Sequence, residues 1–431
     1  MKIVAFLPAK GTSSRIENKN IKLLDGKPLF LHTLEKLSSC NFIDEVYLDS
    51  ESEEIFDLAQ NVDCKFLKRD VSLATNKTDG NSLFYNEVRQ VEADIYIQIL
   101  GTSPFIKKET IQKGIEILKT QNEYDSVILV KKEKLYTWNE QTANYNLEHI
   151  PNSVDLPDTI IETMGLYITR KNVALEMKKR IGKNPYLLEA STIEAVDVNY
   201  PDEFELANFI AAGIREKERQ LFKNLAYKLT SSMLSDIMDD LGCDTTITSL
   251  SLNLRNKKLL GRAKTLKIRE LNENEDFTGI YDALDSYKTI VPNDIIIVEN
   301  ECSDFAYFGE MNANLAIRAG AIGAIIGGKT RDTKEVADLD FPVFATGAKC
   351  KDVRKRATLE SINKKINLYG VEIYPNDLIF ADNDGIVIIP KKYEEEVIEK
   401  AFEIINKEKN ILSDIMNGKS INDILKNNGE F

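Results

Sequence analysis

The sequence predicts an α/β protein that folds as two domains, and three observations support this. The chain has 431 residues, which is more than one hydrophobic core usually organises. Short apolar segments alternate with helical patterns through the first half, as in sheets built from βαβ units. In the second half, a helix rich in small residues precedes another short apolar segment. We therefore expect a mostly parallel sheet with helices on both faces in the first domain, and a separate domain of strands and helices after it.

The composition is that of an ordinary globular protein, with 43% hydrophobic and 29% charged residues. A formal net charge of -13 argues against a nucleic-acid partner or an anionic membrane held by a basic surface. Five cysteines, an odd number without paired spacing, indicate reduced thiols. Two histidines are too few for a histidine-based metal site, and no apolar run approaches the roughly 18 residues of a membrane helix. The chain enters a strand at once, without the apolar core of a signal peptide, so we expect a cytoplasmic protein.

The first element is a buried strand over Ile3–Leu7, which stops at a proline. The loop Lys10–Asn20 follows, and its small and hydroxyl-bearing residues let backbone N–H groups approach phosphate oxygens. Lys10, Arg15 and Lys19 add positive charge against a triphosphate. This combination indicates a nucleotide site, and the alternative is an ordinary turn from strand to helix with solvated lysines.

The other elements of the first half follow in regular order. A turn at Asp25–Gly26 precedes a helical pattern. Further strands are expected at 45–49, 65–67, 94–100 and 126–130, and further helices at 52–61, 81–91 and 108–119. In such sheets ligands bind beyond the carboxyl ends of the strands, which is where the loop after the first strand lies.

The opening stretch also carries a specific motif, whose matching residues are Leu7, Pro8, Ala9, Lys10, Ser13, Ile16, Lys19 and Asn20. It resembles the signature of the CMP-sialic acid synthetase (acylneuraminate cytidylyltransferase) family, and the resemblance spans about residues 1–215. The family has arginine where this chain has Lys10, which keeps the charge but loses the two-pronged geometry. The resemblance implies a Rossmann-like nucleotidyltransferase domain with a mostly parallel sheet, which binds CTP and a sugar acid.

By this resemblance, three segments bind the nucleotide through Pro8, Ala9, Lys10, Gly11, Ser13, Asn20, Thr78, Asp79, Thr102 and Ser103. The stretch 73–82 is similar to the family segment that approaches the cytosine and the ribose. Leu100 and Gly101 replace the family's glutamine and proline, and Gln98 stands at a different position along the strand, so the family's polar contact toward the sugar acid is in doubt. The choice of sugar acid depends on pocket residues such as those around 162–167.

A second polar pair is Asp197 and Asn199, which alternate with valines and so leave one face of an expected strand. In the family this pair is Asp-x-Asp and binds Mg²⁺, and a hard cation shared with phosphate oxygens tolerates Asn199. The alternative is a strand end followed by a helix cap at Asp202. The resemblance implies attack by a sugar hydroxyl on the α-phosphate of CTP, with Lys10 and Lys19 as catalytic residues that neutralise charge.

A helical pattern over Asp202–Gln220 becomes strongly charged at Arg215–Arg219, and a new apolar pattern follows. We therefore expect the domains to cover residues 1–220 and 221–431. The second domain begins with an amphipathic helix over Ser231–Gly242, which ends at a glycine.

The informative part of the second half is Gly309–Asp332, which has the pattern of a turn, a small-residue helix, a buried strand and a second turn. It ends on the adjacent residues Arg331 and Asp332, and twenty residues separate Glu310 from Arg331. Taken alone, the adjacent charges could be a surface ion pair of little energetic value.

This spacing resembles that of the RraA-like family, which includes metal-dependent 4-hydroxy-4-methyl-2-oxoglutarate aldolases. Further matches lie at 235–236, 261–265, 292–294, 341–344 and 376–385. The resemblance covers about residues 225–405 and implies a swivelling β/β/α domain, usually trimeric, with its site between subunits.

The same resemblance implies roles for single residues. Asp332 would bind Mg²⁺ or another divalent cation, and Arg331 would bind the carboxylate of pyruvate or a related keto acid. Glu310 would act through a water molecule, and backbone amides near Met311 and Asn312 would orient the substrate. The metal would stabilise the pyruvate enolate as a Lewis acid. Members without the Arg-Asp pair are thought of as non-enzymatic regulators of RNase E.

Together the two halves predict a bifunctional enzyme, because a 2-keto-3-deoxy sugar acid is formally pyruvate joined to an aldehyde. The first domain would activate the acid with CTP, and the second would act on a related keto acid as an aldolase or decarboxylase. In one alternative the second domain only oligomerises or regulates the first, and in another the whole chain is a binding protein with two inactive sites. Dimer contacts from the first domain and trimer contacts from the second would favour a homo-hexamer.

Overall fold

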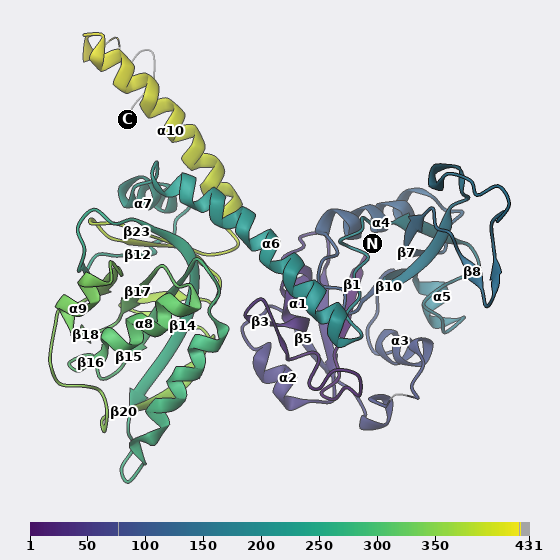
Figure 1. The fold of residues 1–431 in the computed structure, drawn as a ribbon, viewed down its shortest axis with the longest axis horizontal. Coiled ribbons are helices and arrows are strands. Elements are labelled where there is room, and N and C mark those ends of the chain that lie inside the picture. The colour runs from purple at the N-terminus through teal and green to yellow at the C-terminus, as the bar shows by residue number, and fades with distance from the viewer. Residues whose placement is uncertain (76, 422, 424–431) are drawn as a thin grey trace. The chain divides into compact units, whose positions relative to one another are not determined.

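The computed structural model describes residues 1–75, 77–421 and 423, and it divides into two compact units, Met1–Ala212 and Gly213–Phe431 (Figure 1). The division falls inside one continuous helix, α6 (Pro201–Ala226), so the domain boundary expected near residue 220 also lies within that helix. The charged run that suggested a boundary is therefore a partly exposed stretch of helix.

The first unit contains a seven-stranded sheet in the order β11-β7-β10-β6-β1-β4-β5. The strands are β1 (Ile3–Pro8), β4 (Glu45–Ser50), β5 (Lys65–Lys68), β6 (Ile95–Ile99), β7 (Ser126–Glu133), β10 (Thr159–Arg170) and β11 (Pro185–Glu189). In this sheet β10 alone pairs antiparallel with both of its neighbours, and the other pairings are parallel. The predicted α/β class with a mostly parallel sheet is confirmed.

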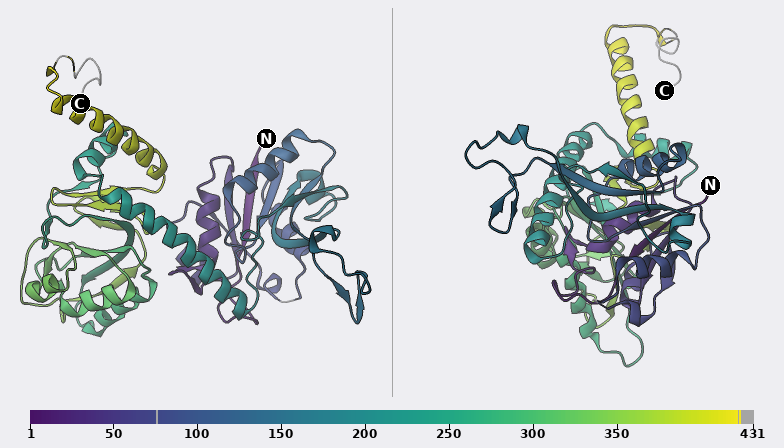
Figure 2. Two further views of the ribbon diagram at one scale, coloured as in Figure 1. Left: turned by 45° about the horizontal axis from the view of Figure 1, so that its top comes forward. Right: turned by 90° about the vertical axis from the view of Figure 1, so that its right-hand side faces the viewer.

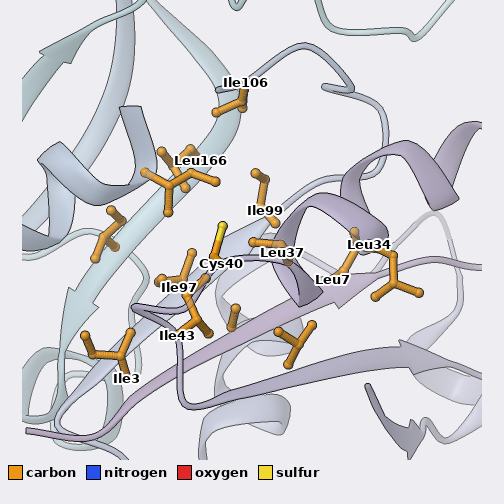
Figure 3. Close-up of a cluster of buried hydrophobic side chains, with 14 of the residues drawn as sticks. Ile3, Leu7, Leu34, Leu37, Cys40, Ile43, Ile97, Ile99, Ile106 and Leu166 are labelled. Carbon is orange, nitrogen blue, oxygen red and sulfur yellow. The ribbon is translucent and has the colours of Figure 1, made fainter. Parts of the chain in front are cut away.

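Helices cover both faces of this sheet. They are α1 (Leu29–Ser38), α2 (Glu53–Leu58), α3 (Gly80–Val88), α4 (Lys108–Thr120) and α5 (Lys171–Leu175), with 3-10 turns at Val71–Leu73 and Ser153–Asp155. Alternate residues of β1 enter opposite cores. Ile3 and Leu7 pack with Leu34 and Leu37 of α1 (Figure 3), whereas Phe6 packs against α3 and α5 on the other face. Burial on both faces explains why the strand is an unbroken apolar run.

Two hairpins interrupt this pattern. The turn at Asp25–Gly26 joins β2 (Leu23–Leu24) to β3 (Lys27–Pro28), and both turn residues have positive φ, which a two-residue hairpin turn requires. A second hairpin of β8 (Trp138–Asn139) and β9 (Thr142–Ala143) extends away from the sheet of the first unit in both views of Figure 2.

The second unit is built on a nine-stranded sheet in the order β12-β24-β23-β14-β15-β17-β19-β13, with β20 paired to β14. Its strands are β12 (Thr246–Ile247), β13 (Ser251–Leu252), β14 (Leu259–Glu270), β15 (Asp294–Asn300), β17 (Gly323–Ile326), β19 (Val343–Ala345), β20 (Ala357–Ile362), β23 (Leu378–Ala381) and β24 (Ile386–Ile389). Two small pairs accompany it, β16 (Ala306–Phe308) with β18 (Lys329–Thr330) and β21 (Ile366–Leu368) with β22 (Val371–Ile373).

The helices of the second unit are α7 (Ser231–Asp240), α8 (Glu310–Ala319), α9 (Thr333–Asp338) and α10 (Glu394–Met416), with a 3-10 segment at Phe277–Thr289. One face of the large sheet packs against α8, α9 and the 3-10 segment, and the other face packs against the β21–β22 pair. This layering is the β/β/α arrangement expected from the sequence. Among the described residues, none of the helices combines the length and the apolar character needed to cross a membrane.

Each end of α6 contributes to a different core. Phe204 and Ala211 lie in a cluster with Leu24 and Leu29 of the first unit. Phe222 and Leu225 lie in a cluster with the buried residues of α7 in the second unit. The helix is therefore an integral part of both units.

Candidate functional site

The loop after β1 is tied to the segment that follows β4. The amide of Ala9 donates to the carbonyl of Asp49 at 2.9 Å, and the amide of Gly11 donates to Oε1 of Glu51 at 2.7 Å. A Cβ atom on Gly11 would lie 2.8 Å from Cβ of Ser52, so this approach requires glycine. The Gly11 amide, expected to face phosphate, donates to a carboxylate in the structure.

Four polar residues far apart in sequence meet near this loop. Nζ of Lys19 donates to the carbonyl of Val198 at 2.9 Å and lies 3.5 Å from Oδ1 of Asn199. The Asn199 amide donates to Oδ2 of Asp197, and Oγ of Ser103 lies 3.4 Å from Oδ1 of Asp197. The structure thus brings together one predicted catalytic residue, one predicted nucleotide ligand and both predicted metal ligands.

The electrostatics of this cluster agree with a site for a polyanion. Burial, together with the nearby positive charges of Arg15 and Lys10, lowers the pKa of Lys19 to about 8, although the negative charge of Asp197 opposes the shift. An anionic ligand beside these three cations would favour the protonated form of Lys19. Asn20 supports the loop, because its side-chain amide donates to the carbonyl of Lys10 at 2.7 Å.

The prediction that Asp197 and Asn199 lie on a strand is wrong. These residues lie in an irregular segment that leads into α6, where the amide of Val198 donates to the carbonyl of Thr102 at 2.8 Å. The side chains still lie together, because Asn199 bonds to Asp197 directly. The cap expected at Asp202 is supplied instead by Glu203, whose Oε2 accepts from the amides of Asn199 and Tyr200 at 2.6 and 2.9 Å.

Other predicted nucleotide ligands stand at the start of α3. Oδ1 of Asp79 accepts from the amides of Asn81 and Ser82 at 3.0 and 3.1 Å and so caps that helix. The hydroxyl of Thr78 shares a hydrogen bond with Thr75 at 3.2 Å. The carboxylate of Asp79 is thus already committed to the helix start, and Thr78 keeps this turn closed.

The stretch 162–167, expected to line the sugar-acid pocket, lies on the strand β10, and sequence reasoning missed Arg180 beside it. The hydroxyl of Tyr167 donates to Glu162, and the guanidinium of Arg180 lies 3.9 Å from the centre of the Tyr167 ring. A Cβ atom on Gly80 would lie 2.6 Å from Cζ of Arg180, so the arginine packs directly on the start of α3. No spacing in the sequence pointed to Arg180. Gln98 is buried within the unit and donates to Glu87 at 2.7 Å, so its side chain is committed elsewhere.

In the second unit, Asp332 lies at the N-terminus of α8. Its Oδ2 accepts from the amide of Glu310 at 3.2 Å. A Cβ atom on Gly309 would lie 2.5 Å from that oxygen and 3.0 Å from Cγ of Arg331. Asp332 itself has φ +52°, a left-handed conformation that few residues other than glycine adopt. The backbone around the Arg-Asp pair is therefore held in an unusual conformation.

Arg331 is positioned by two carboxylates. Its Nη1 lies 2.9 Å from Oδ2 of Asp352, and its Nε lies 3.7 Å from Oδ2 of Asp332. Asp352 was not expected from the sequence, where it stands in an uninformative basic stretch. The side chains of Arg331 and Asp332 both remain about two-fifths exposed, so the pair is accessible to a ligand.

The remaining predicted residues of this site lie on the first turn of α8. Glu310 and Met311 are exposed. The side-chain amide of Asn312 donates to the carbonyl of Tyr307 at 2.7 Å. The backbone amide of Asn312 is one of the N–H groups that a first helical turn leaves unpaired, so it can meet a substrate.

The donor atoms at both sites suit a hard cation. Asp197 and Asn199 offer carboxylate and amide oxygens, and Asp332 offers a carboxylate. In the described part of the chain, no three His, Cys, Asp or Glu side chains gather as a ready-made cation site. A Mg²⁺ ion at either position would take most of its ligands from substrate and water, which is its usual behaviour in proteins.

Comparison with known proteins identifies both units. Residues 4–181 match the family model described as Cytidylyltransferase, and residues 231–388 match the model described as Aldolase/RraA. A putative 4-hydroxy-4-methyl-2-oxoglutarate aldolase of Halalkalibacterium halodurans is 30% identical over 175 residues, which are 40% of this chain and 78% of that protein.

Two proteins of Legionella pneumophila are also similar. A CMP-N,N'-diacetyllegionaminic acid synthase is 34% identical over 125 residues, 28% of this chain and 54% of the relative. Protein DlpA is 26% identical over 208 residues, 47% of this chain and 34% of its own length. The matches thus span about half and about a third of these two relatives. Residues 4–181 are thus similar to cytidylyltransferases, and through residues 231–388 the chain belongs to the Aldolase/RraA family.

Proposed function

We propose that the first unit transfers CMP from CTP to a hydroxyl group of a 2-keto-3-deoxy sugar acid and releases pyrophosphate. The observation that carries this proposal is the meeting of Lys19, Ser103, Asp197 and Asn199 beside the loop after β1. Relatives named as synthases of CMP-activated acids support the choice of nucleotide and acceptor class.

In the proposed reaction, the acceptor oxygen attacks the α-phosphorus of CTP, the bond to the β-phosphate oxygen breaks, and the hydroxyl proton is released. Lys19 and Lys10 would neutralise charge on the phosphates, and the fixed loop would orient them. Asp197 and Asn199 would hold a Mg²⁺ ion, whose positive charge stabilises the departing pyrophosphate. Binding of CTP would have to displace or share the hydrogen bond from Gly11 to Glu51.

The test is pyrophosphate release from CTP and Mg²⁺ with a panel of sugar acids. We expect release with at least one 2-keto-3-deoxy sugar acid and a loss of at least about 100-fold in Asp197→Ala. Asp202→Ala is the matched control, because this nearby residue is exposed and the amides at the start of α6 are bound by Glu203 instead. Equal activity in the wild type and Asp197→Ala would contradict the proposed site.

For the second unit we propose divalent-metal-dependent aldol or decarboxylase chemistry on a keto acid derived from pyruvate. Arg331 would bind the substrate carboxylate, Asp332 would hold the cation, and Glu310 would hold a water that moves the proton. The cation would stabilise the enolate. Exchange of the methyl protons of pyruvate with deuterated water, followed by NMR, tests this in the full chain, with Arg331→Ala expected to abolish the exchange.

One observation favours the alternative of a non-catalytic oligomerisation or regulatory module. Arg331 is already paired with Asp352, so a substrate carboxylate must compete for the guanidinium. This alternative predicts no pyruvate exchange and no effect of Arg331→Ala on CTP turnover. We also propose that the full chain forms a homo-oligomer, namely a hexamer, and light scattering would measure its mass.

A further inference from the structure

A polar cluster that the proposed reaction does not use lies buried between the loop after β1 and α3. Its members are Asp49, Arg69, Glu87 and Gln98, which are 0%, 5%, 0% and 1% exposed. Arg69 donates from Nε to Oδ1 of Asp49 at 3.0 Å and from Nη2 to the Asp49 carbonyl at 2.7 Å. Gln98 donates from Nε2 to Oε2 of Glu87 at 2.7 Å.

Two carboxyl oxygens of this cluster lack a donor in the described structure. They are Oδ2 of Asp49 and Oε1 of Glu87, and both are fully buried. A hydrogen bond between the two side chains is among the causes that raise the pKa of Glu87 and oppose the rise in the pKa of Asp49. Buried acceptors without donors are costly, and one proton between these two oxygens would satisfy both.

Charge balance assigns that proton to Glu87. Burial raises the pKa of Asp49 too, but the directly paired Arg69 opposes that shift, whereas Glu87 receives only the neutral amide of Gln98. Burial, and after it the negative charge of Asp49, raises the pKa of Glu87 well above its usual value. The other charge that acts on Asp49 is that of Glu51, which is also negative. It therefore cannot balance the negative charge that an ionised Glu87 would add.

The cluster connects two parts of the proposed nucleotide site. The carbonyl of Asp49 holds the amide of Ala9 and so fixes the loop that leads to Lys10 and Gly11. Glu87 belongs to the last turn of α3, whose N-cap is Asp79. A hydrogen bond from Glu87 to Asp49 would therefore fix the loop relative to α3.

We propose that the carboxyl groups of Asp49 and Glu87 share one proton, and that this bond positions the loop after β1 against α3 for binding CTP. The proposal rests on the proposed function for its ligand, but not for the shared proton. Asp49 and Glu87 are positioning residues, since neither reaches the substrate.

Glu87→Gln is the decisive variant, because its amide can donate to Asp49 while its carbonyl accepts from Gln98. Glu87→Leu removes both bonds at similar volume. With CTP, we expect Glu87→Gln to stay within about twofold of the wild-type KM, and Glu87→Leu to raise the KM about tenfold with kcat changed less than twofold. These values would be measured well below the melting temperature of each variant.

A spectroscopic measurement tests the shared proton directly and needs no nucleotide. Infrared difference spectra at pH 7 should show the C=O stretch of a protonated carboxyl in the full wild-type chain and not in Glu87→Gln. Absence of that band from the wild type would overturn the proposal, as would a KM of Glu87→Gln as high as that of Glu87→Leu. If the band is present but CTP is not bound by the wild type, the proposed function fails, and with it the role of the pair in nucleotide binding.

Discussion

The backbone amide of Glu310 donates to the carboxylate of Asp332 at 3.2 Å, although the two residues are 22 positions apart. The carboxylate thus faces the positive end of the α8 dipole. Both residues of this contact belong to the proposed keto-acid site. The start of α8 therefore determines where a cation and a substrate would bind.

Gly309→Ala should disable this site. The added Cβ would lie 2.5 Å from Oδ2 of Asp332 and 3.0 Å from Cγ of Arg331, so the pair must move. We expect the rate of pyruvate methyl exchange to fall at least about tenfold and the stability to fall by about 1–3 kcal/mol. The control is Gly213→Ala in α6, where a Cβ would meet nothing within 4 Å and alanine should stabilise the helix by about 0.5–1 kcal/mol. Normal exchange in Gly309→Ala would show that the geometry at Asp332 is not needed.

Asn199→Asp should change the dependence of CTP turnover on Mg²⁺. In the absence of a cation, the new carboxylate would repel Asp197, because both side chains are negatively charged. The substitution also removes the hydrogen bond that the Asn199 amide donates to Asp197. With the cation present it adds an anionic oxygen ligand. We expect half-maximal activity at about a tenth of the Mg²⁺ concentration that the wild type needs. A titration with Mg²⁺ at saturating CTP measures this, and an unchanged midpoint would place the cation elsewhere.

Lys10→Arg should strengthen binding of CTP. A guanidinium can make two parallel hydrogen bonds to a phosphate, whereas an ammonium acts as a point charge. We expect the KM for CTP to fall about threefold, with little change of kcat, because the charge is the same. Steady-state kinetics with varied CTP give the answer, and a higher KM would mean that the loop has no room for the larger side chain.

His32 should make the first unit sensitive to acid. Burial lowers the pKa of His32 to about 4, and in the neutral form its Nε2–H donates to the carbonyl of Leu24 at 2.8 Å. The unfolded chain takes up a proton near pH 6.5, so stability is lost as the pH falls from about 6.5 to 4, by about 3 kcal/mol. His32→Gln keeps an N–H donor but does not titrate. Denaturant unfolding of both proteins at pH 7 and pH 4.5 should show a smaller pH effect in the variant, and equal losses would exclude His32 as the cause.

Periodicity predicted the fold well where strands are buried on both faces. β1, β4 and β6 and their helices lie close to the expected positions. The reason is that a short apolar run between turn residues can adopt few structures other than a buried strand. The hairpin β8–β9 was not predicted, since its strands are only two residues long and mostly exposed. The segment around Asp197 alternates like a strand but pairs with no neighbour along its length, and alternation alone cannot show this.

The residues of the two candidate sites were likewise predicted only in part. Motif spacing selected Lys19, Asp197, Arg331 and Asp332, which the structure places in two clusters. It could not find Asp352, whose carboxylate becomes a neighbour of Arg331 only through the pairing of distant segments. Such partners follow from the three-dimensional path of the chain and leave no local pattern.

Helix α6 makes it difficult to separate the two proposed activities by expressing each unit alone. The family matches end at residue 181 and resume at residue 231, so the helix falls in the stretch that neither match covers. Yet removing Phe204 would open the core of one half, and removing Phe222 would open the core of the other. A protein shortened to either unit should therefore keep the entire helix. Its apolar residues that pack on the missing unit would then be exposed to solvent.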